Sequence, residues 1–133
     1  MDRRRFLQNT GLGASALMFP QWLLKAQENN FPVRAITKGP KFHWFGYYDK
    51  LQFNQSNTKV LGMQVDFESR SPTKDDVIKM GVIDLQNGDQ WTEIGESRSW
   101  GWQQGCMLQW VPGSDNKVIW NDRRGNQFVS ILK

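Results

Sequence analysis

Two stretches of the chain, 57 residues apart, share one pattern. The first runs from Leu51 to Leu61 and the second from Leu108 to Ile119. Each begins with Leu-Gln-aromatic, continues through a turn, and ends in Lys-Val-aliphatic. Self-similarity at a fixed spacing is the signature of a repeat architecture, in which each repeat forms one unit of supersecondary structure. This repeat limits the folds available to the chain more than any other feature of the sequence.

Apolar and β-branched runs separated by turn residues predict short β-strands from Lys41 onward, and no helical period persists after the amino-terminal segment. The Asn87-Gly88 pair is typical of a hairpin turn. Short connections between the strands favour an antiparallel meander. We expect a first unit over residues 41–98 and an incomplete second unit over residues 99–133. The predicted strands are 49–53, 59–65, 79–85, 90–94, 107–110, 117–120 and 127–132.

The predicted fold class is therefore all-β. Antiparallel meanders of four strands that repeat along a chain are typical of the blades of a β-propeller. Since propellers close with about four to eight blades, about two blades indicate an amino-terminal fragment of a larger propeller. A small sandwich or an open sheet is the alternative. In the blade arrangement, we expect Trp110 to be buried between sheets.

The repeated turns also resemble those of the TolB-like propeller family, whose blades carry aromatic-Ser-Pro-Asp-Gly-Lys before an aliphatic strand. The matching stretches are Phe53–Val60 and Trp110–Val118. That family's third strand reads aliphatic-Asp-Leu-x-x-Gly, which Ile83 to Gly88 matches. The resemblance covers about residues 41–133 and implies propeller blades. It does not imply one activity, because one fold hosts many unrelated functions.

Residues 1–26 have the parts of an export signal: a basic start, an apolar run and a weak cleavage region. Arg3, Arg4, Phe6 and Leu7 resemble the twin-arginine signal, although Asp2 and Gln8 depart from its first and last positions. The resemblance implies the twin-arginine export machinery as a partner and an extracytoplasmic location, in the periplasm or cell envelope. The protein then contacts the membrane only transiently, through the signal segment, unless this segment stays uncleaved. The alternative is a basic amphipathic amino terminus on a cytosolic protein. Residues 27–40 form a predicted linker into the folded part.

The net charge of +4 comes from this amino-terminal segment. From Gln27 onward there are 13 basic and 12 acidic residues, so the folded part is nearly neutral. A nucleic-acid-binding protein needs a basic face, and we therefore expect no nucleic-acid partner. The single Cys106 cannot form an internal disulfide, and we expect it to be a buried apolar residue.

Candidate ligand-binding residues follow from the order of the strands. Successive connections of a meander alternate between its two ends, so polar and aromatic loops of one end come together. Histidine and arginine recognise anions, amides fix orientation, and neighbouring tryptophans supply apolar walls. These loops could instead tie neighbouring blades together. The candidates are His43, Tyr48, Gln103, Gln104 and Arg123.

We expect an exported protein that binds a ligand or partner at this loop face. The alternative is a carbohydrate-active enzyme acting on an acidic carbohydrate, because TolB-like propellers are similar in fold to oligogalacturonate lyases, whose metal is held by His and Gln. Only His43, Gln103 and Gln104 offer those residue types in suitable loops. One histidine without a cysteine or a second histidine cannot make a metal site from this segment alone. No metal site is therefore predicted, and the cofactor, the catalytic residues and enzymatic activity itself stay open.

Overall fold

The computed structural model describes residues 31–133, of which Arg34–Lys133 form one unit. The predicted signal segment, with Arg3, Arg4, Phe6 and Leu7, lies outside the described residues, as does the start of the predicted linker. The strands are β1 (Phe42–Trp44), β2 (Lys59–Val65), β3 (Ile78–Asp84), β4 (Gln90–Ser97), β5 (Gln109–Trp110), β6 (Val118–Arg124) and β7 (Gln127–Leu132).

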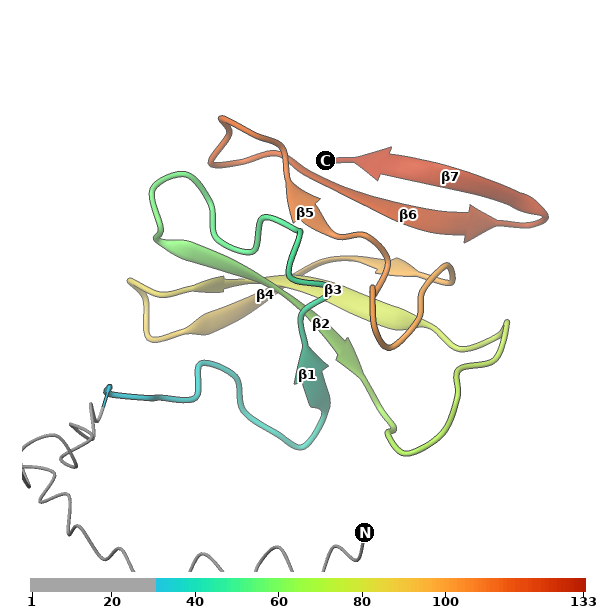
Figure 1. Cartoon of the computed structure of the whole chain (residues 1–133), viewed down its shortest axis with the longest axis horizontal. Coiled ribbons are helices and arrows are strands. Elements are labelled where there is room, and N and C mark those ends of the chain that lie inside the picture. Colours follow the sequence, from blue (N-terminus) through green and yellow to red (C-terminus); the bar gives the residue numbers. More distant parts are fainter. Residues whose placement is uncertain (1–30) are drawn as a thin grey trace, which may run out of the picture. The chain divides into compact units, whose positions relative to one another are not determined.

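These strands form two antiparallel sheets (Figure 1). The first has the order β1-β2-β3-β4 and the second the order β5-β6-β7, so every pair of sheet neighbours is also consecutive in the chain. The Asn87-Gly88 pair lies in the turn between β3 and β4, where Gly88 has a φ of 63°. No helix occurs among residues 31–133, and the predicted all-β class of antiparallel sheets is confirmed.

The predicted first strand over 49–53 is wrong. Only Phe53 pairs there, through an isolated bridge to Val60, whereas the strand forms at β1, in a stretch predicted as a loop. The chain leaves β2 beyond Gln52, whose carbonyl accepts the N–H of Leu61 at 2.9 Å, because the carbonyl of Leu51 accepts the N–H of Trp110 in the second sheet at 3.3 Å. Asn54 closes the adjoining turn, where its buried Oδ1 accepts the backbone N–H groups of Thr58 and Lys59 at 2.9 and 2.8 Å. The edge of β2 further along is then free to pair with β1.

The two repeated turns have matching pairings. Phe53 bridges Val60, and Trp110 pairs with Val118 at the start of β6. The turns also contact each other, because the Ser56 backbone N–H donates to Oδ1 of Asp115 at 2.9 Å. Each turn is followed by an antiparallel hairpin, β2–β3 in one sheet and β6–β7 in the other.

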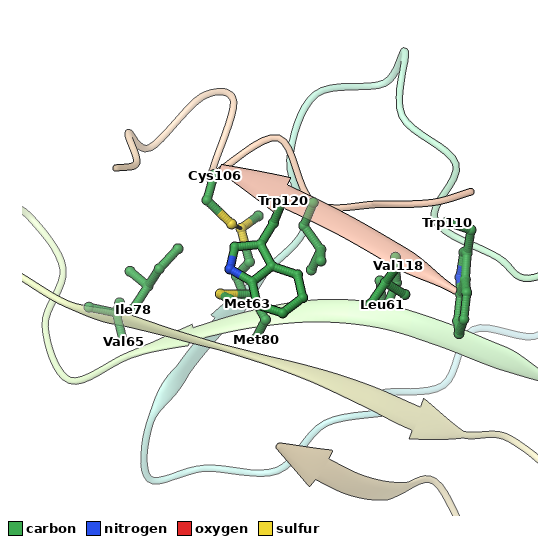
Figure 2. Packing of buried hydrophobic residues seen from close by; sticks show 10 residues of the cluster. Leu61, Met63, Val65, Ile78, Met80, Cys106, Trp110, Val118 and Trp120 are labelled. Atoms are coloured by element: carbon green, nitrogen blue, oxygen red, sulfur yellow. Dashed lines mark hydrogen bonds between the residues drawn. The ribbon is translucent and has the colours of Figure 1, made fainter. Parts of the chain in front are cut away.

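The core lies between the two sheets (Figure 2). Alternate residues of β2, among them Leu61, Met63 and Val65, face the second sheet, because successive side chains of a strand point to opposite faces. Trp110 is 3% exposed in this core, which confirms the expected burial. The other members are Ile78, Met80, Cys106, Leu108, Val118 and Trp120.

The opposite face of the first sheet is covered by one tryptophan. Gly62 and Gly81 are paired across β2 and β3, and the indole of Trp91 lies over both. A Cβ at Gly81 would lie well inside van der Waals contact with this ring. The absence of side chains at these two positions therefore lets Trp91 reach the sheet backbone.

Candidate functional site

His43 lies in β1, on the face of the first sheet that carries Trp91. Its Nε2 is 2.7 Å from Nε2 of Gln64, and its ring meets the Trp91 indole edge-to-face at 5.3 Å between centroids. Burial lowers the pKa of His43, because it disfavours the charged imidazolium. A cavity of about 430 Å³ adjoins it, lined by Ala35, Ile36, Thr37, Lys38, His43, Gln64, Gly88, Asp89, Gln90 and Trp91.

Gln103 and Gln104 are exposed in a tight turn closed by hydrogen bonds between Gly101 and Gly105. Gly105 needs its positive φ of 59° there. The turn lies on the other side of the first sheet from His43, since Trp44 follows His43 in β1 and packs against Trp102 at 5.4 Å. The structure therefore separates His43 from both glutamines.

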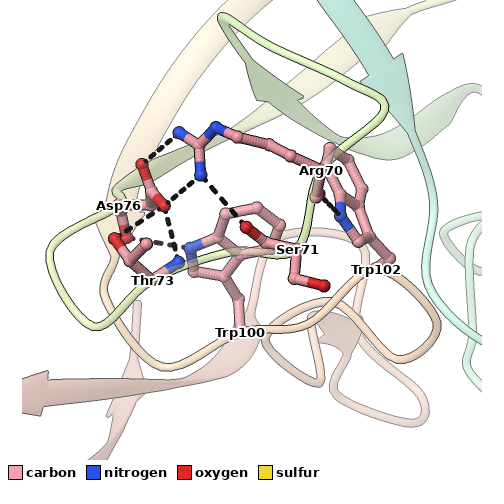
Figure 3. A network of polar contacts seen from close by, with 6 residues as sticks. All are labelled: Arg70, Ser71, Thr73, Asp76, Trp100 and Trp102. Carbon is pink, nitrogen blue, oxygen red and sulfur yellow. Dashed lines mark hydrogen bonds and ion pairs between the residues drawn. The ribbon is translucent and has the colours of Figure 1, made fainter.

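The loop between β2 and β3 is held by a network that sequence reasoning missed (Figure 3). Arg70 donates two hydrogen bonds to the carboxylate of Asp76, at 2.8 and 2.7 Å. The backbone N–H and the hydroxyl of Thr73 donate to the same carboxylate. These bonds, the guanidinium foremost, hold the pKa of Asp76 well below its usual range. The pairing depends on loop geometry, and the sequence shows only oppositely charged residues six positions apart.

Two tryptophans from the connection between β4 and β5 form hydrogen bonds to this loop. Trp100 donates its indole N–H to the backbone carbonyl of Asp76 at 2.9 Å, and Trp102 donates to that of Arg70 at 2.6 Å. Their rings stack edge-to-face at 5.2 Å. The loops of residues 66–77 and 100–104 therefore meet at one end of the sheets, as expected for alternating connections of a meander, and both indole N–H groups and the Asp76 carboxylate are hydrogen-bonded within them.

Arg123 joins the same end of the sheets. Its guanidinium donates to the backbone carbonyl of Lys74. The residue also lines a cleft of about 610 Å³ at this end of the two sheets. Of the five candidate residues, only Arg123 lines this cleft. Tyr48 lies on the connection between β1 and β2 and is 86% exposed. The cleft wall consists of Asp75, Gly95, Glu96, Arg98, Trp120, Asp122, Arg123, Arg124, Gly125 and Ile131.

The charged side chains of the cleft wall differ in how firmly hydrogen bonds and ion pairs hold them. Asp122 Oδ1 accepts the backbone N–H groups of Arg98 and Arg123 at 3.0 and 2.7 Å, so this carboxylate is held in the wall. The Arg98 guanidinium is 3.4 Å from Glu96, and that of Arg124 is 3.8 Å from Asp122. The guanidinium groups of Arg98 and Arg124 are 47% and 69% exposed, and ion pairs of such exposed groups at these distances are weak. The guanidinium groups of Arg98 and Arg124 can therefore turn to a bound anion at low cost.

Trp120 forms part of the same wall. The residue is buried, and its indole N–H has no hydrogen-bond partner among the described residues. Gly95 lies against this ring, because a Cβ there would be 2.8 Å from Cζ2 of Trp120. A buried donor without a partner costs free energy, and this N–H has no exposed surface through which a ligand in the cleft could reach it. The alternation of side chains along β6 indicates that Trp120 is buried, but only the tertiary structure shows which residues contact its ring.

Cys106 is fully buried beside Met63, as expected, and burial raises its pKa to about 12. Within residues 31–133, no group of three or more His, Cys, Asp and Glu side chains could hold a metal ion. The described part of the chain also has no helix long and apolar enough to cross a membrane.

No protein-family model, curated protein or solved structure matches this chain. The arrangement of its own residues is consequently the basis for an inference about function.

Proposed function

We propose that this chain is an exported, propeller-type protein that binds an acidic carbohydrate in the cleft lined by Arg98, Arg123 and Arg124. The observation that carries the proposal is the set of weakly paired guanidinium groups in the wall of this cleft. Guanidinium groups bind carboxylates through paired hydrogen bonds. The cleft volume of about 610 Å³ is in the range of small-molecule sites.

An acidic sugar suits this cleft better than a simple anion does. Asp75 and Glu96 would repel a bare anion, but their carboxylates accept hydrogen bonds from hydroxyl groups. A sugar acid carries both groups, so its carboxylate meets the arginines while its hydroxyls meet the acids. Ile131 and the ring of Trp120 supply the apolar part of the wall.

The wider architecture supports a propeller-type protein in one respect. Two antiparallel sheets built from repeated turns pack face to face over a shared core, as adjacent blades of a propeller do. The proposed export through the twin-arginine route is supported by the sequence of residues 1–26 alone. The proposal favours binding over a lyase-type activity, because His43 and the glutamines Gln103 and Gln104 lie on different sides of the first sheet.

Titration calorimetry with a trimer of galacturonic acid, and with the neutral galactose trimer as control, tests the proposal. We expect the acidic trimer to bind and the neutral one to bind at least about tenfold more weakly, since one charge-assisted hydrogen bond is worth about 1.5–3 kcal/mol. Replacing Arg98 and Arg124 together by Ala should weaken the binding of the acidic trimer by at least about tenfold. Lys117→Ala removes a charge at an exposed position outside the cleft wall and should leave binding unchanged. Equal affinity for both trimers, or no binding of either, would refute the proposal.

A further inference from the structure

The loop between β2 and β3 contains a tight turn over residues 73–76. The carbonyl of Thr73 accepts the backbone N–H of Asp76 at 3.2 Å, which is the hydrogen bond of a β-turn. Lys74 and Asp75 are the two central residues of this turn. Both contribute to the cleft, because the Lys74 carbonyl accepts a hydrogen bond from the Arg123 guanidinium and Asp75 forms part of the cleft wall.

The side chain of Asp76 closes this turn a second time. Its Oδ2 accepts the backbone N–H of Thr73 at 2.6 Å and the Thr73 hydroxyl at 2.8 Å. Two bonds from the Arg70 guanidinium connect the same carboxylate to an earlier part of the loop (Figure 3). The backbone carbonyl of Asp76 accepts the indole N–H of Trp100 at 2.9 Å, which joins the turn to the connection between β4 and β5. One residue therefore fixes both the conformation and the position of the turn.

This turn lies outside the hydrophobic core. None of residues 66–77 is fully buried, and the side chains of Arg70 and Asp76 are 46% and 17% exposed. Core packing therefore does not explain why so many hydrogen bonds converge on Asp76. A binding site gives a reason for them, because groups that are held in place before the ligand arrives lose less conformational entropy when it binds.

We propose that Asp76 is a positioning residue for this cleft. By closing the turn, Asp76 holds the Lys74 carbonyl where this group fixes the Arg123 guanidinium, and it keeps Asp75 in the cleft wall. The inference rests on the proposed binding of an acidic carbohydrate in the same cleft. A guanidinium has five N–H donors, so the bond to Lys74 leaves others for the carboxylate of a sugar acid. The other two arginines of the cleft have only weak ion pairs, so Arg123 is the one whose direction is set before binding.

Titration calorimetry of the full chain with the galacturonic acid trimer tests the inference. Asp76→Ala should weaken binding at least about tenfold, although it changes no side chain of the cleft wall. Arg70→Met removes one partner of the same carboxylate and leaves the bonds from Thr73, so it should weaken binding by a smaller factor. Circular dichroism shows whether each variant is folded, and Arg70→Met serves for the test if Asp76→Ala does not fold.

Glu93→Ala is the matched control. It also removes a carboxylate that forms an ion pair, with Lys79 at 2.8 Å, but Glu93 lies in β4 outside the cleft wall. This variant should bind the trimer as the wild type does. Wild-type affinity in folded Asp76→Ala and Arg70→Met would overturn the inference.

A double-mutant cycle separates positioning from a general loosening of the loop. If Asp76 acts through Arg123, then Asp76→Ala should weaken binding by at most about threefold in a protein that already carries Arg123→Ala. Equal factors in the two backgrounds would also overturn the inference, because the effect of Asp76 would then not pass through Arg123.

NMR relaxation of the ligand-free protein distinguishes a failure of this inference from a failure of the proposed function. The Nε–Hε group of Arg123, assigned by its absence in Arg123→Ala, reports how ordered this side chain is. We expect an ordered group in the wild type and in Glu93→Ala, and a mobile group in Asp76→Ala. Equal order in the wild type and Asp76→Ala would overturn the inference whether or not the trimer binds. If the wild type binds no trimer but Asp76→Ala releases Arg123, only the proposed carbohydrate is refuted and the positioning role stands.

Discussion

The indole of Trp91 lies directly over Gly81, close enough that the ring occupies the space a Cβ would need. The two residues belong to adjacent strands, β4 and β3. Trp91 also meets His43 edge-to-face, so the glycine, the tryptophan and the histidine form one layer on the face of the first sheet that points away from the second. This layer depends on the missing side chain at Gly81.

The first prediction follows from this contact. Gly81→Ala should destabilise the protein by about 1–3 kcal/mol, because the new methyl group forces the Trp91 ring or the strand to move. Urea unfolding followed by tryptophan fluorescence measures the loss. Gly101→Ala is the matched control, since nothing lies within 4 Å of a Cβ at Gly101. Equal losses for the two variants would contradict the predicted overlap.

The second prediction concerns Trp110. Trp110→Ala should cost about 3–5 kcal/mol of unfolding free energy, because it removes a buried ring between the sheets. It also leaves the carbonyl of Gln52 without the indole donor that lies 3.0 Å away. Tyr48→Ala, at a position 86% exposed, should change stability by less than about 0.5 kcal/mol. A loss below about 1 kcal/mol for Trp110→Ala, measured by urea unfolding, would place the ring outside the core.

The third prediction concerns the dependence of stability on pH. The pKa of Asp76 is depressed in the fold by Arg70 first and by Thr73 next. The ionised carboxylate therefore stabilises the fold above the unfolded pKa of about 4, and this contribution is lost as the pH falls through the folded pKa. Urea midpoints measured from neutral pH to below pH 4 should consequently fall more steeply for the wild type than for Asp76→Asn.

Asp66→Asn is the control for this pH series. Asp66 is an exposed carboxylate that pairs only with the exposed Lys41. This variant should follow the wild type at every pH. If Asp76→Asn and the wild type lost stability in parallel on acidification, the network around Asp76 would not contribute to the pH dependence.

The fourth prediction concerns export. Replacing Arg3 and Arg4 with Lys should leave a tagged protein in the cytoplasm, because the twin-arginine pattern would be lost. Cell fractionation and blotting for the tag measure the location. Replacing the nearby Lys25 with Arg is the control and should leave export intact. Normal export of the Arg3 and Arg4 double variant would rule out the twin-arginine route.

Most strands could be predicted from the sequence because their signals are local. Strands β2, β3, β4 and β7 lie within a few residues of the predicted ranges, since apolar and β-branched runs mark each strand and turn residues such as Asn87-Gly88 bound it. The β6 strand extends to Arg124, beyond the predicted end at Trp120, because pairing with β7 carries it to the next turn. The first strand was misplaced because the carbonyl of Leu51 bonds the N–H of Trp110 in the second sheet, so the chain leaves the edge of β2, and a contact between such distant residues leaves no local pattern in the sequence.

The sequence by itself determined the all-β class, the repeated turns and the burial of Trp110, because alternation and turn chemistry act between neighbouring residues. Only the tertiary structure decided which polar groups meet. The contacts of Trp100 with Asp76 and of Arg123 with Lys74 join residues 24 and 49 positions apart. The faces of the strands also separate His43 from Gln103 and Gln104. Such contacts depend on how two sheets pack, and the packing depends on the whole core at once, so no local pattern specifies them.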